Sequence, residues 1–293
     1  NANLLLINVP FKVPALLLVP QHLVALTTLG ISSGLVLDVG YKESIAVPVV
    51  EGVTIIDALQ YAPLGSKAIH FRIMDELIQR QSIIRQNGQE SVIKDAFEKD
   101  LLEDIKVRTC FVAPFEKGIE LAKEKTKTSI DVDIKSGLGT PCDVNYPIDG
   151  TKTLVVPGAL RESVCEVMFE MYGDEHTVPT LIIEAILQSP RDVRKLLASN
   201  IVIIGGTSML PGFKHRIMKE LKSLATSNRF KSSMHFDEFA FHNLTTCKEN
   251  YAAWLGASIF GSTEVLATRA LTKEQYIKNE KSIQDWSSWT PCG

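Results

Sequence analysis

Residues 34–52 read GLVLDVGYKESIAVPVVEG, and the rest of the chain is organised around them. The apolar run 34–37 has strand length and ends at a carboxylate, Asp38; Gly40 follows in a short turn, and the β-branched run 44–50 predicts a second strand. Glycine lets backbone N–H groups approach an anion, and an aspartate at a strand end can hold Mg²⁺. The stretch is therefore a candidate phosphate hairpin, and an ordinary hairpin with an Asp-x-Gly turn is the alternative.

A second stretch, Ile201–Gly212, repeats this arrangement with the sequence IVIIGGTSMLPG. Its apolar strand runs into Gly205 and Gly206, and Thr207 leads toward a predicted amphipathic helix that begins near Phe213. Glycines between a strand and a helix N-terminus allow a nucleotide to lie against bare backbone. Two such turns that face one another would form a nucleotide cleft.

Both stretches, in this order and at this separation, resemble the actin superfamily. LVLDVG…VPVVEG resembles the family's second phosphate hairpin, and IVIIGGTSMLPGF resembles its adenosine-side loop. LLEDIKVRTCFVA at 101–113, YAAWLGASIF at 251–260 and LTKEQY at 271–276 match further family segments, so the likeness spans nearly the whole chain. The resemblance implies an α/β fold of the actin-like (ribonuclease-H-like) ATPase type, comprising the half with the second phosphate hairpin and its inserted subdomain.

Against the family pattern, the sequence lacks the first sheet with its own phosphate hairpin and the small domain that follows it. The chain starts without Met, inside a predicted strand at Leu4–Val9, so we expect a fragment with roughly the last two-thirds of an actin-like chain. The expected division follows the family's subdomains: 1–28 as the remainder of subdomain 1, 29–64 as the first part of subdomain 3, 65–170 as subdomain 4, 171–251 as the second part of subdomain 3, and 252–293 as C-terminal helices returning to subdomain 1.

Within the superfamily, the resemblance is to the divergent actin-related subunit at the pointed end of dynactin. It rests on VPQHLVALTTLGISS, LEDIKVRTCFV, NYPIDG and LVVPGALRESVCEVMFE. The resemblance implies a structural subunit that terminates an actin-like filament and supports dynein-driven transport along microtubules. Its implied partners are other dynactin subunits and, indirectly, dynein, and its implied location is the cytoplasmic cytoskeleton.

The resemblance also assigns a nucleotide site. Asp38 matches the family's metal-ordering aspartate, Gly40 its first hairpin glycine and Lys106 its adenine-side lysine. Gly205, Gly206 and Thr207 match the adenosine-side loop. ATP with Mg²⁺ is therefore a possible structural ligand of the full-length protein.

Departures from the family pattern argue against hydrolysis. Tyr41 and Lys42 replace an aspartate and a glycine of the hairpin turn, where a Cβ either strains φ or reshapes the loop. Val107 replaces the acidic residue that holds the ribose, and Ile45 replaces the catalytic histidine. Gln21 alone matches the glutamine that orients the attacking water. Hydrolysis by a positioned water needs all of these residues together, so we expect that the protein is not an enzyme and has no catalytic residue.

Two other functions remain open. Asp38, Gln21 and the Gly205–Gly206 pair are the features that favour an active actin-like protein, which polymerises and hydrolyses ATP. A chaperone of the related Hsp70 architecture is the more distant alternative, because no peptide-binding domain follows in this sequence.

Composition sets broad limits on partners. The chain has 293 residues, of which 45% are hydrophobic and 22% charged, with a formal net charge of −3, so bulk charge does not favour nucleic acid or an anionic membrane. No apolar run reaches the roughly 18 residues of a membrane span. The cysteines lack metal-ligand spacing and predict reduced thiols and no metal site; they are Cys110, Cys142, Cys165, Cys247 and Cys292.

Four local patterns give further expectations about secondary structure. An amphipathic helix is predicted over Lys67–Gln81 and a strand over Thr109–Val112. Ser82–Lys99 is polar and weakly periodic, which predicts loop and solvated helix. Ser189 and Pro190 are expected to cap and open a helix.

Overall fold

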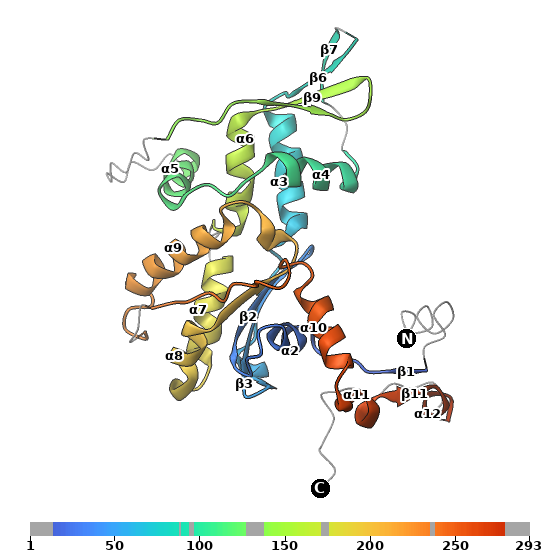
Figure 1. Cartoon of the computed structure of the whole chain (residues 1–293). Coiled ribbons are helices and arrows are strands. Elements are labelled where there is room, and N and C mark those ends of the chain that lie inside the picture. The colour runs from blue at the N-terminus through green and yellow to red at the C-terminus, as the bar shows by residue number, and fades with distance from the viewer. Residues whose placement is uncertain are drawn as a thin grey trace.

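A computed structural model describes residues 14–87, 89–93, 97–126, 138–170, 176–234 and 238–278. Figure 1 shows two units, one built around a central sheet and the other around the helix α3 and a small outer sheet. The predicted strand Leu4–Val9 and Cys292 lie outside the described residues. The α/β fold class expected from the sequence is confirmed.

Five strands form the central sheet: β2 (Gly34–Val39), β3 (Ser44–Val50), β4 (Val53–Thr54), β5 (Gln60–Ala62) and β10 (Ile201–Ile204). Their order is β10–β2–β3–β4, and β5 also pairs with β3. The strand β10 runs parallel to β2, while β3 runs antiparallel to β2. The two stretches that define the fold therefore supply neighbouring strands at the centre of the sheet.

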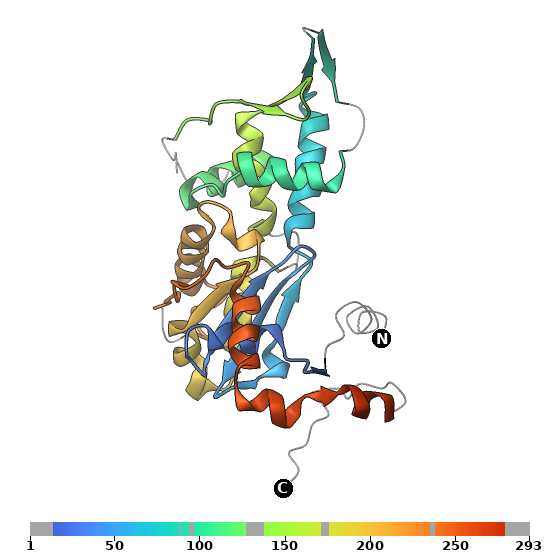
Figure 2. The same ribbon diagram turned by 45° about the vertical axis from the view of Figure 1, so that its right-hand side comes forward.

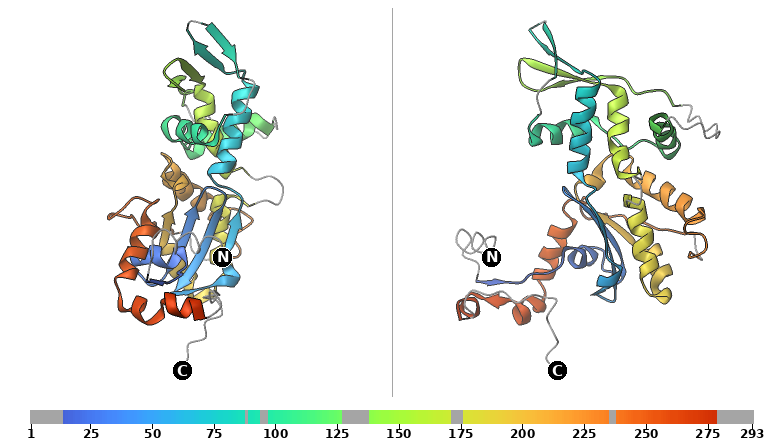
Figure 3. Two further views of the ribbon diagram at one scale, coloured as in Figure 1. Left: turned by 90° about the vertical axis from the view of Figure 1, so that its right-hand side faces the viewer. Right: turned by 180° about the vertical axis from the view of Figure 1, so that it is seen from behind.

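Helices cover both faces of this sheet, which explains why β2 and β10 are almost continuously apolar. On one face lie α7 (Val178–Gln188), α8 (Arg191–Ser199) and α9 (Phe213–Thr226). On the other lie α2 (Gln21–Thr27) and α10 (Ala252–Gly261), as the rear view in Figure 3 shows. Leu35 and Leu37 point into the larger core on the α7 side, whereas Val36 packs on the α2 side. Strand alternation therefore directs Asp38 to the α2 face.

The described part of the second unit contains the helical segments α3 (Ser66–Gln79), α4 (Lys99–Thr109), α5 (Phe115–Thr126), α6 (Gly158–Ser163) and the 3₁₀ helix η2 (Val164–Met168). Its antiparallel sheet has the order β7–β6–β9–β8: β6 (Ile83–Gln86), β7 (Gln89–Val92), β8 (Val144–Pro147) and β9 (Lys152–Val156). Figure 2 shows this sheet at the end of the molecule farthest from β2 and β3. The predicted helix at Lys67–Gln81 is confirmed as α3.

The remaining elements are short: β1 (Ala15–Leu16), η1 (Ile56–Ala58), η3 (Thr207–Met209), α11 (Glu264–Arg269), β11 (Leu271–Thr272) and α12 (Lys273–Lys278). The strands β1 and β11 pair antiparallel and bring the beginning and the end of the described chain together.

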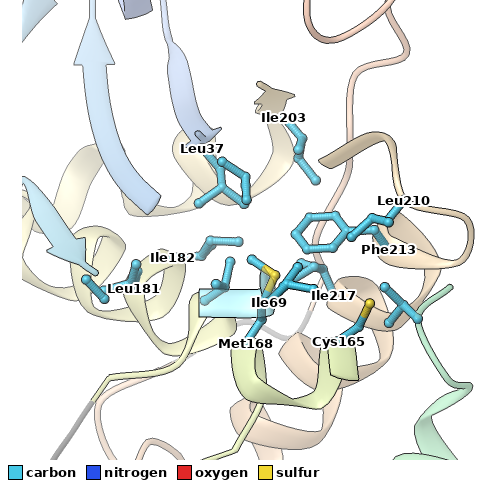
Figure 4. Packing of buried hydrophobic residues seen from close by; sticks show 14 of the residues in the cluster. Leu37, Ile69, Cys165, Met168, Leu181, Ile182, Ile203, Leu210, Phe213 and Ile217 are labelled. Carbon is cyan, nitrogen blue, oxygen red and sulfur yellow. The ribbon is translucent and has the colours of Figure 1, made fainter. Parts of the chain in front are cut away.

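One continuous hydrophobic core joins the two units. Leu37 of β2 and Phe213 of α9 belong to the same cluster of buried residues as Ile69 of α3 and Met168 of η2 (Figure 4). All four side chains are fully buried. The second unit is therefore packed against the central sheet through apolar contacts and is more than a tethered insertion.

A buried ion pair strengthens this junction. Arg216 of α9 donates two hydrogen bonds to Glu166 of η2, at 2.9 and 2.8 Å, and a third to Glu220 at 2.8 Å. Its guanidinium also stacks on Phe169, 4.5 Å from the ring centroid, and donates to the backbone oxygen of Ala113. Burial raises the pKa of Glu166, and the paired arginine opposes that effect. The bidentate geometry gives the buried charges the partners that they need.

The prediction of a strand at Thr109–Val112 is wrong. Thr109 ends α4, and the next three residues run extended without joining a sheet. The N–H of Phe111 donates to the oxygen of Arg161, and the N–H of Val112 donates to the oxygen of Pro211. Because these two acceptors belong to different segments, residues 109–112 have no single neighbouring strand with which to build a ladder.

The prediction of loop and solvated helix over Ser82–Lys99 is also wrong, since this segment contains the β6–β7 hairpin. All four residues of β7 are exposed, so the hairpin needs no apolar alternation, which is the signal that reveals a half-buried strand. Asn87 adopts a positive φ of 50° at its turn, a conformation that asparagine tolerates well.

The predicted cap at Ser189–Pro190 is wrong in its role. The Ser189 hydroxyl donates to the oxygen of Ala185 at 2.8 Å and so closes α7, while Pro190 is the N-cap residue of α8. Because the two helices follow one another directly, the serine serves the helix that ends and not the one that begins.

We predict that Arg216→Ala lowers the free energy of unfolding by about 3–5 kcal/mol, because it leaves the Glu166 carboxylate buried without its partner. Urea denaturation of the full-length protein measures the change. Lys219→Ala, an exposed position on the same helix, is the matched control and is expected to stay within about 0.5 kcal/mol of wild type. An Arg216→Ala midpoint equal to that of Lys219→Ala would show that the ion pair contributes no net stability.

Candidate functional site

The candidate site lies where β2 and β10 end side by side. Their parallel register places Ile204 beside Asp38, so the turn after β2 and the turn after β10 leave the sheet at the same edge. Five of the six predicted site residues meet there: Asp38, Gly40, Gly205, Gly206 and Thr207. The sixth, Lys106, is connected to them through one intervening residue, Ser66, whose hydroxyl accepts from Lys106 and whose backbone N–H donates to the oxygen of Gly40 at 3.1 Å.

The Gly205–Thr207 turn requires glycine at position 205, whereas at Gly206 the backbone is not covered by neighbouring atoms. Gly205 has a φ of +96°, and a Cβ there would lie 2.3 Å from the oxygen of Val39 and 2.7 Å from Asp38 Oδ1. A Cβ on Gly206 would meet nothing within 4 Å. The Thr207 hydroxyl donates to the oxygen of Gly40 at 2.8 Å and so ties the two turns together. Gly205 thus allows the two turns to pack closely, and the backbone at Gly206 is accessible to a ligand.

Asp38 already has a partner within the chain. Gln21 of α2 donates from Nε2 to Asp38 Oδ2 at 2.9 Å. Burial raises the pKa of the Asp38 carboxyl, and the negative charge of Glu43 raises it further. Sequence reasoning treated Gln21 and Asp38 separately, and no local pattern marks their contact because α2 and β2 meet only in the tertiary structure.

The hairpin turn accommodates its two side chains without a left-handed backbone. Neither Tyr41 nor Lys42 has a positive φ angle, and the N–H of Gly40 donates to the oxygen of Glu43 at 3.0 Å across the turn. Ile45 lies directly across from Asp38 in the β2–β3 ladder, where its apolar side chain can neither donate nor accept a proton.

Lys106 is buried in a polar network of its own. Its ammonium group donates to the Ser66 hydroxyl and to Glu103 Oε1, the latter at 2.7 Å. Glu103 Oε2 accepts from the Ser66 hydroxyl at 2.8 Å and lies 2.9 Å from His70 Nε2. Burial opposes ionisation of Glu103, but hydrogen bonds from Lys106 and Ser66 outweigh it and hold the pKa of this carboxyl below its ordinary value. Burial and the charge of Lys106 lower the pKa of His70.

Sequence reasoning missed Ser66, His70 and Glu103 entirely. The spacing of Ser66 and His70 on α3, and of Glu103 and Lys106 on α4, places each pair on one helix face and was the available signal. That spacing alone does not show that the two faces meet.

A magnesium nucleotide fits one side of this site better than the other. Bare backbone at Gly206 and the carboxylate of Asp38 suit phosphate and a hydrated cation. On the base side, the charge of Lys106 is already neutralised by Glu103, and Val107 offers only an exposed apolar side chain. Within the described ranges, no three His, Cys, Asp or Glu side chains are grouped as metal ligands.

A surface hollow of about 370 Å³ adjoins the second turn. Met209, Lys214, His215 and Lys248 are among the residues that line it. Lys214 is ion-paired with Glu249, whose backbone oxygen also accepts from the N–H of Gly205. The lysine therefore supports the turn, and its charge is matched within the protein.

The fold and site define an α/β protein in which two glycine-containing turns meet at the edge of a central sheet. The sequence profile of the actin family matches residues 9–284, and the chain belongs to this family.

Three curated relatives align with most of this chain at low identity. The chain is 26% identical over 325 residues to actin-related protein 10 of Dictyostelium discoideum, which covers 96% of this chain, and 29% identical over 276 residues to centractin of Schizosaccharomyces pombe, which covers 93%. It is also 26% identical to putative actin-29 of Dictyostelium discoideum, again with 93% of the chain covered. The aligned region spans 64% of the length of each relative.

The described helices include none with the length and apolar character required to cross a membrane. Cys110, Cys142, Cys165 and Cys247 carry free thiols.

We predict that Gly205→Ala destabilises the protein, whereas Gly206→Ala does not. The left-handed φ of Gly205 alone costs an alanine about 1–3 kcal/mol, and contact with Val39 adds to this. Gly206 has room and an ordinary helical φ, so its change is expected to stay within about 0.5 kcal/mol. Thermal unfolding of both variants tests the contrast, and equal melting temperatures would contradict it.

We predict that Asp38→Asn stabilises the protein at neutral pH by about 0.5–2 kcal/mol. Because the folded-state pKa of Asp38 is raised, the folded protein keeps this proton to higher pH than the unfolded chain does, and stability falls as pH rises through the folded pKa. Asparagine removes that loss while its side-chain oxygen still accepts from Gln21. Below the ordinary pKa of 3.8, the advantage disappears.

Urea midpoints measured between pH 3 and pH 8 test this dependence. Asp57→Asn, the same substitution at an exposed position in η1, serves as the control. A stability difference for Asp38→Asn that is constant across this range would exclude the titration of Asp38 as its cause.

Proposed function

We propose that this actin-family chain is part of a structural, actin-related subunit of dynactin, and that it does not hydrolyse ATP. The subunit would end the actin-like filament at its pointed end and support dynein-driven transport along microtubules in the cytoplasm. Support for the family comes from the profile match, and relatives named actin-related protein 10 and centractin point to its actin-related branch. The pointed-end assignment is supported by the motif resemblance described above.

The main support for a protein that does not hydrolyse ATP is that the polar groups of the site are hydrogen-bonded to one another. Gln21 donates its amide to Asp38, and Lys106 is enclosed by Glu103 and Ser66. No proton carrier faces Asp38 from β3, where Ile45 stands. Catalysis by a positioned water requires groups that are free to hold that water, so this arrangement favours a nucleotide that is absent or structural.

On this proposal, the chain follows the family's subdomain pattern. Residues 29–64 and 171–251 would form subdomain 3 around the central sheet, and 65–170 would form subdomain 4. Residues 1–28 and 252–293 would belong to subdomain 1. If a nucleotide binds, it would lie near Asp38, Gly40 and the Gly205–Thr207 turn.

An active actin-like ATPase that polymerises is the second candidate. The open backbone at Gly206 beside a carboxylate is the observation in its favour, because a phosphate and a hydrated cation suit such a turn.

Affinity purification of the tagged full-length protein separates the two. Mass spectrometry would identify co-purified proteins, and chromatography of acid-released nucleotide would show whether ATP or ADP is bound. We expect dynactin subunits together with intact ATP or no nucleotide. Recovery of self-assembled polymer that carries ADP, without dynactin subunits, would overturn the proposal and support the ATPase.

Gly206→Ala is a matched variant for this experiment, because it alters the nucleotide turn at a position where a methyl group meets no protein atom. If the nucleotide is dispensable for assembly, the variant recovers dynactin subunits in wild-type amounts. Loss of these subunits from a variant with wild-type melting temperature would show that assembly depends on the nucleotide turn.

A further inference from the structure

The start of α3 is capped by the turn between β2 and β3. The first N–H groups of a helix have no partner within the helix, and Gly65, the N-cap residue of α3, has no side chain to offer one. The N–H of Ser66 donates to the oxygen of Gly40 at 3.1 Å, and the N–H of Lys67 donates to the oxygen of Tyr41 at 2.8 Å. Two backbone oxygens of the hairpin turn therefore do the work of a capping side chain.

This contact is close enough to require glycine. A Cβ on Gly65 would lie 2.7 Å from the oxygens of both Gly40 and Tyr41. The Thr207 hydroxyl also donates to the Gly40 oxygen, so this single acceptor joins the hairpin, α3 and the turn after β10. The hairpin turn is thus the meeting point of the central sheet and the second unit.

The ring of Tyr41 adds contacts to two helices of the second unit. The ammonium group of Lys99, the first residue of α4, lies 4.0 Å from the centroid of the ring. The ring of His70, on α3, meets it edge to face, with centroids 5.7 Å apart and planes at 64°. Cation–π and edge-to-face contacts of this kind are attractive beyond the area that they bury.

We propose that Tyr41 locks the β2–β3 turn to α3 and α4, so that contacts within the chain hold the second unit against the central sheet. Tyr41 is a positioning residue in this lock: its backbone oxygen caps α3, and its ring keeps the turn in place against Lys99 and His70. The N–H groups that a free helix terminus would offer to an anion are used by the turn. The lock does not depend on the function proposed above.

Hydrogen exchange of the Ser66 and Lys67 amides in the full-length protein tests the lock directly. As the first two N–H groups of α3, they have their protection from the turn and not from the helix. We expect Tyr41→Ala to speed their exchange about tenfold, since it removes both ring contacts. Tyr41→Phe keeps the ring and is expected to exchange at the wild-type rate.

Two further variants make the result specific. Tyr61→Ala removes an exposed tyrosine from the neighbouring strand β5 and is expected to leave both amides unchanged. Lys99→Met removes the cation at an exposed position and is expected to speed exchange about threefold. The amide of Leu35, within the central strand β2, donates to the oxygen of Asn200 at 2.9 Å; it reports global unfolding and is expected to remain protected in every variant.

Wild-type exchange of both amides in Tyr41→Ala would overturn the proposal. So would equally fast exchange in Tyr41→Phe and Tyr41→Ala, because the ring would then have no role. If Tyr41→Ala also speeds exchange at Leu35, the Lys99→Met variant decides: faster exchange confined to Ser66 and Lys67 supports the lock, and no change there overturns it.

Discussion

The parallel pairing of β2 with β10 is the constraint on which the rest of the structure depends. Parallel neighbours need a crossover connection, and here the chain between them forms the whole second unit before it returns through α7 and α8. Because the register sets Ile204 beside Asp38, the two glycine-containing turns must leave the sheet together. Gly205 then has to pass within contact distance of Val39, which only a residue without a side chain can do.

The site formed at this edge has satisfied most of its own polar groups. Buried charges and hydroxyls are costly without partners, and a ligand site often leaves some of them to be completed by the ligand. Here Gln21 donates a hydrogen bond to Asp38, and Glu103 and Ser66 accept hydrogen bonds from Lys106. Contacts within the chain thereby hold the two turns in shape, and this is the feature on which the structural role proposed above depends.

The same logic applies at the junction of the two units. Arg216 and Glu166 lie on α9 and η2, and each would be a buried charge without the other. A pair of this kind adds little net stability over an apolar replacement, yet it penalises any arrangement that separates its members. The apolar cluster supplies attraction between the units, and the ion pair restricts how they can sit against one another.

Sequence alone determined the elements whose signals are local. Apolar runs ending in glycine identified β2 and β10, and helical spacing identified α3 and α9. Tertiary structure alone decided which elements meet. Strand β7 is exposed along its whole length and so has no burial pattern to read, and residues 109–112 have two unrelated neighbours instead of one strand. The sequence identified Lys106 as a candidate site residue. Its ion pair with Glu103 lies within α4, but its hydrogen bond to Ser66 depends on how α3 packs against α4. Local periodicity records which face of an element is buried, and it does not record the partner that buries it.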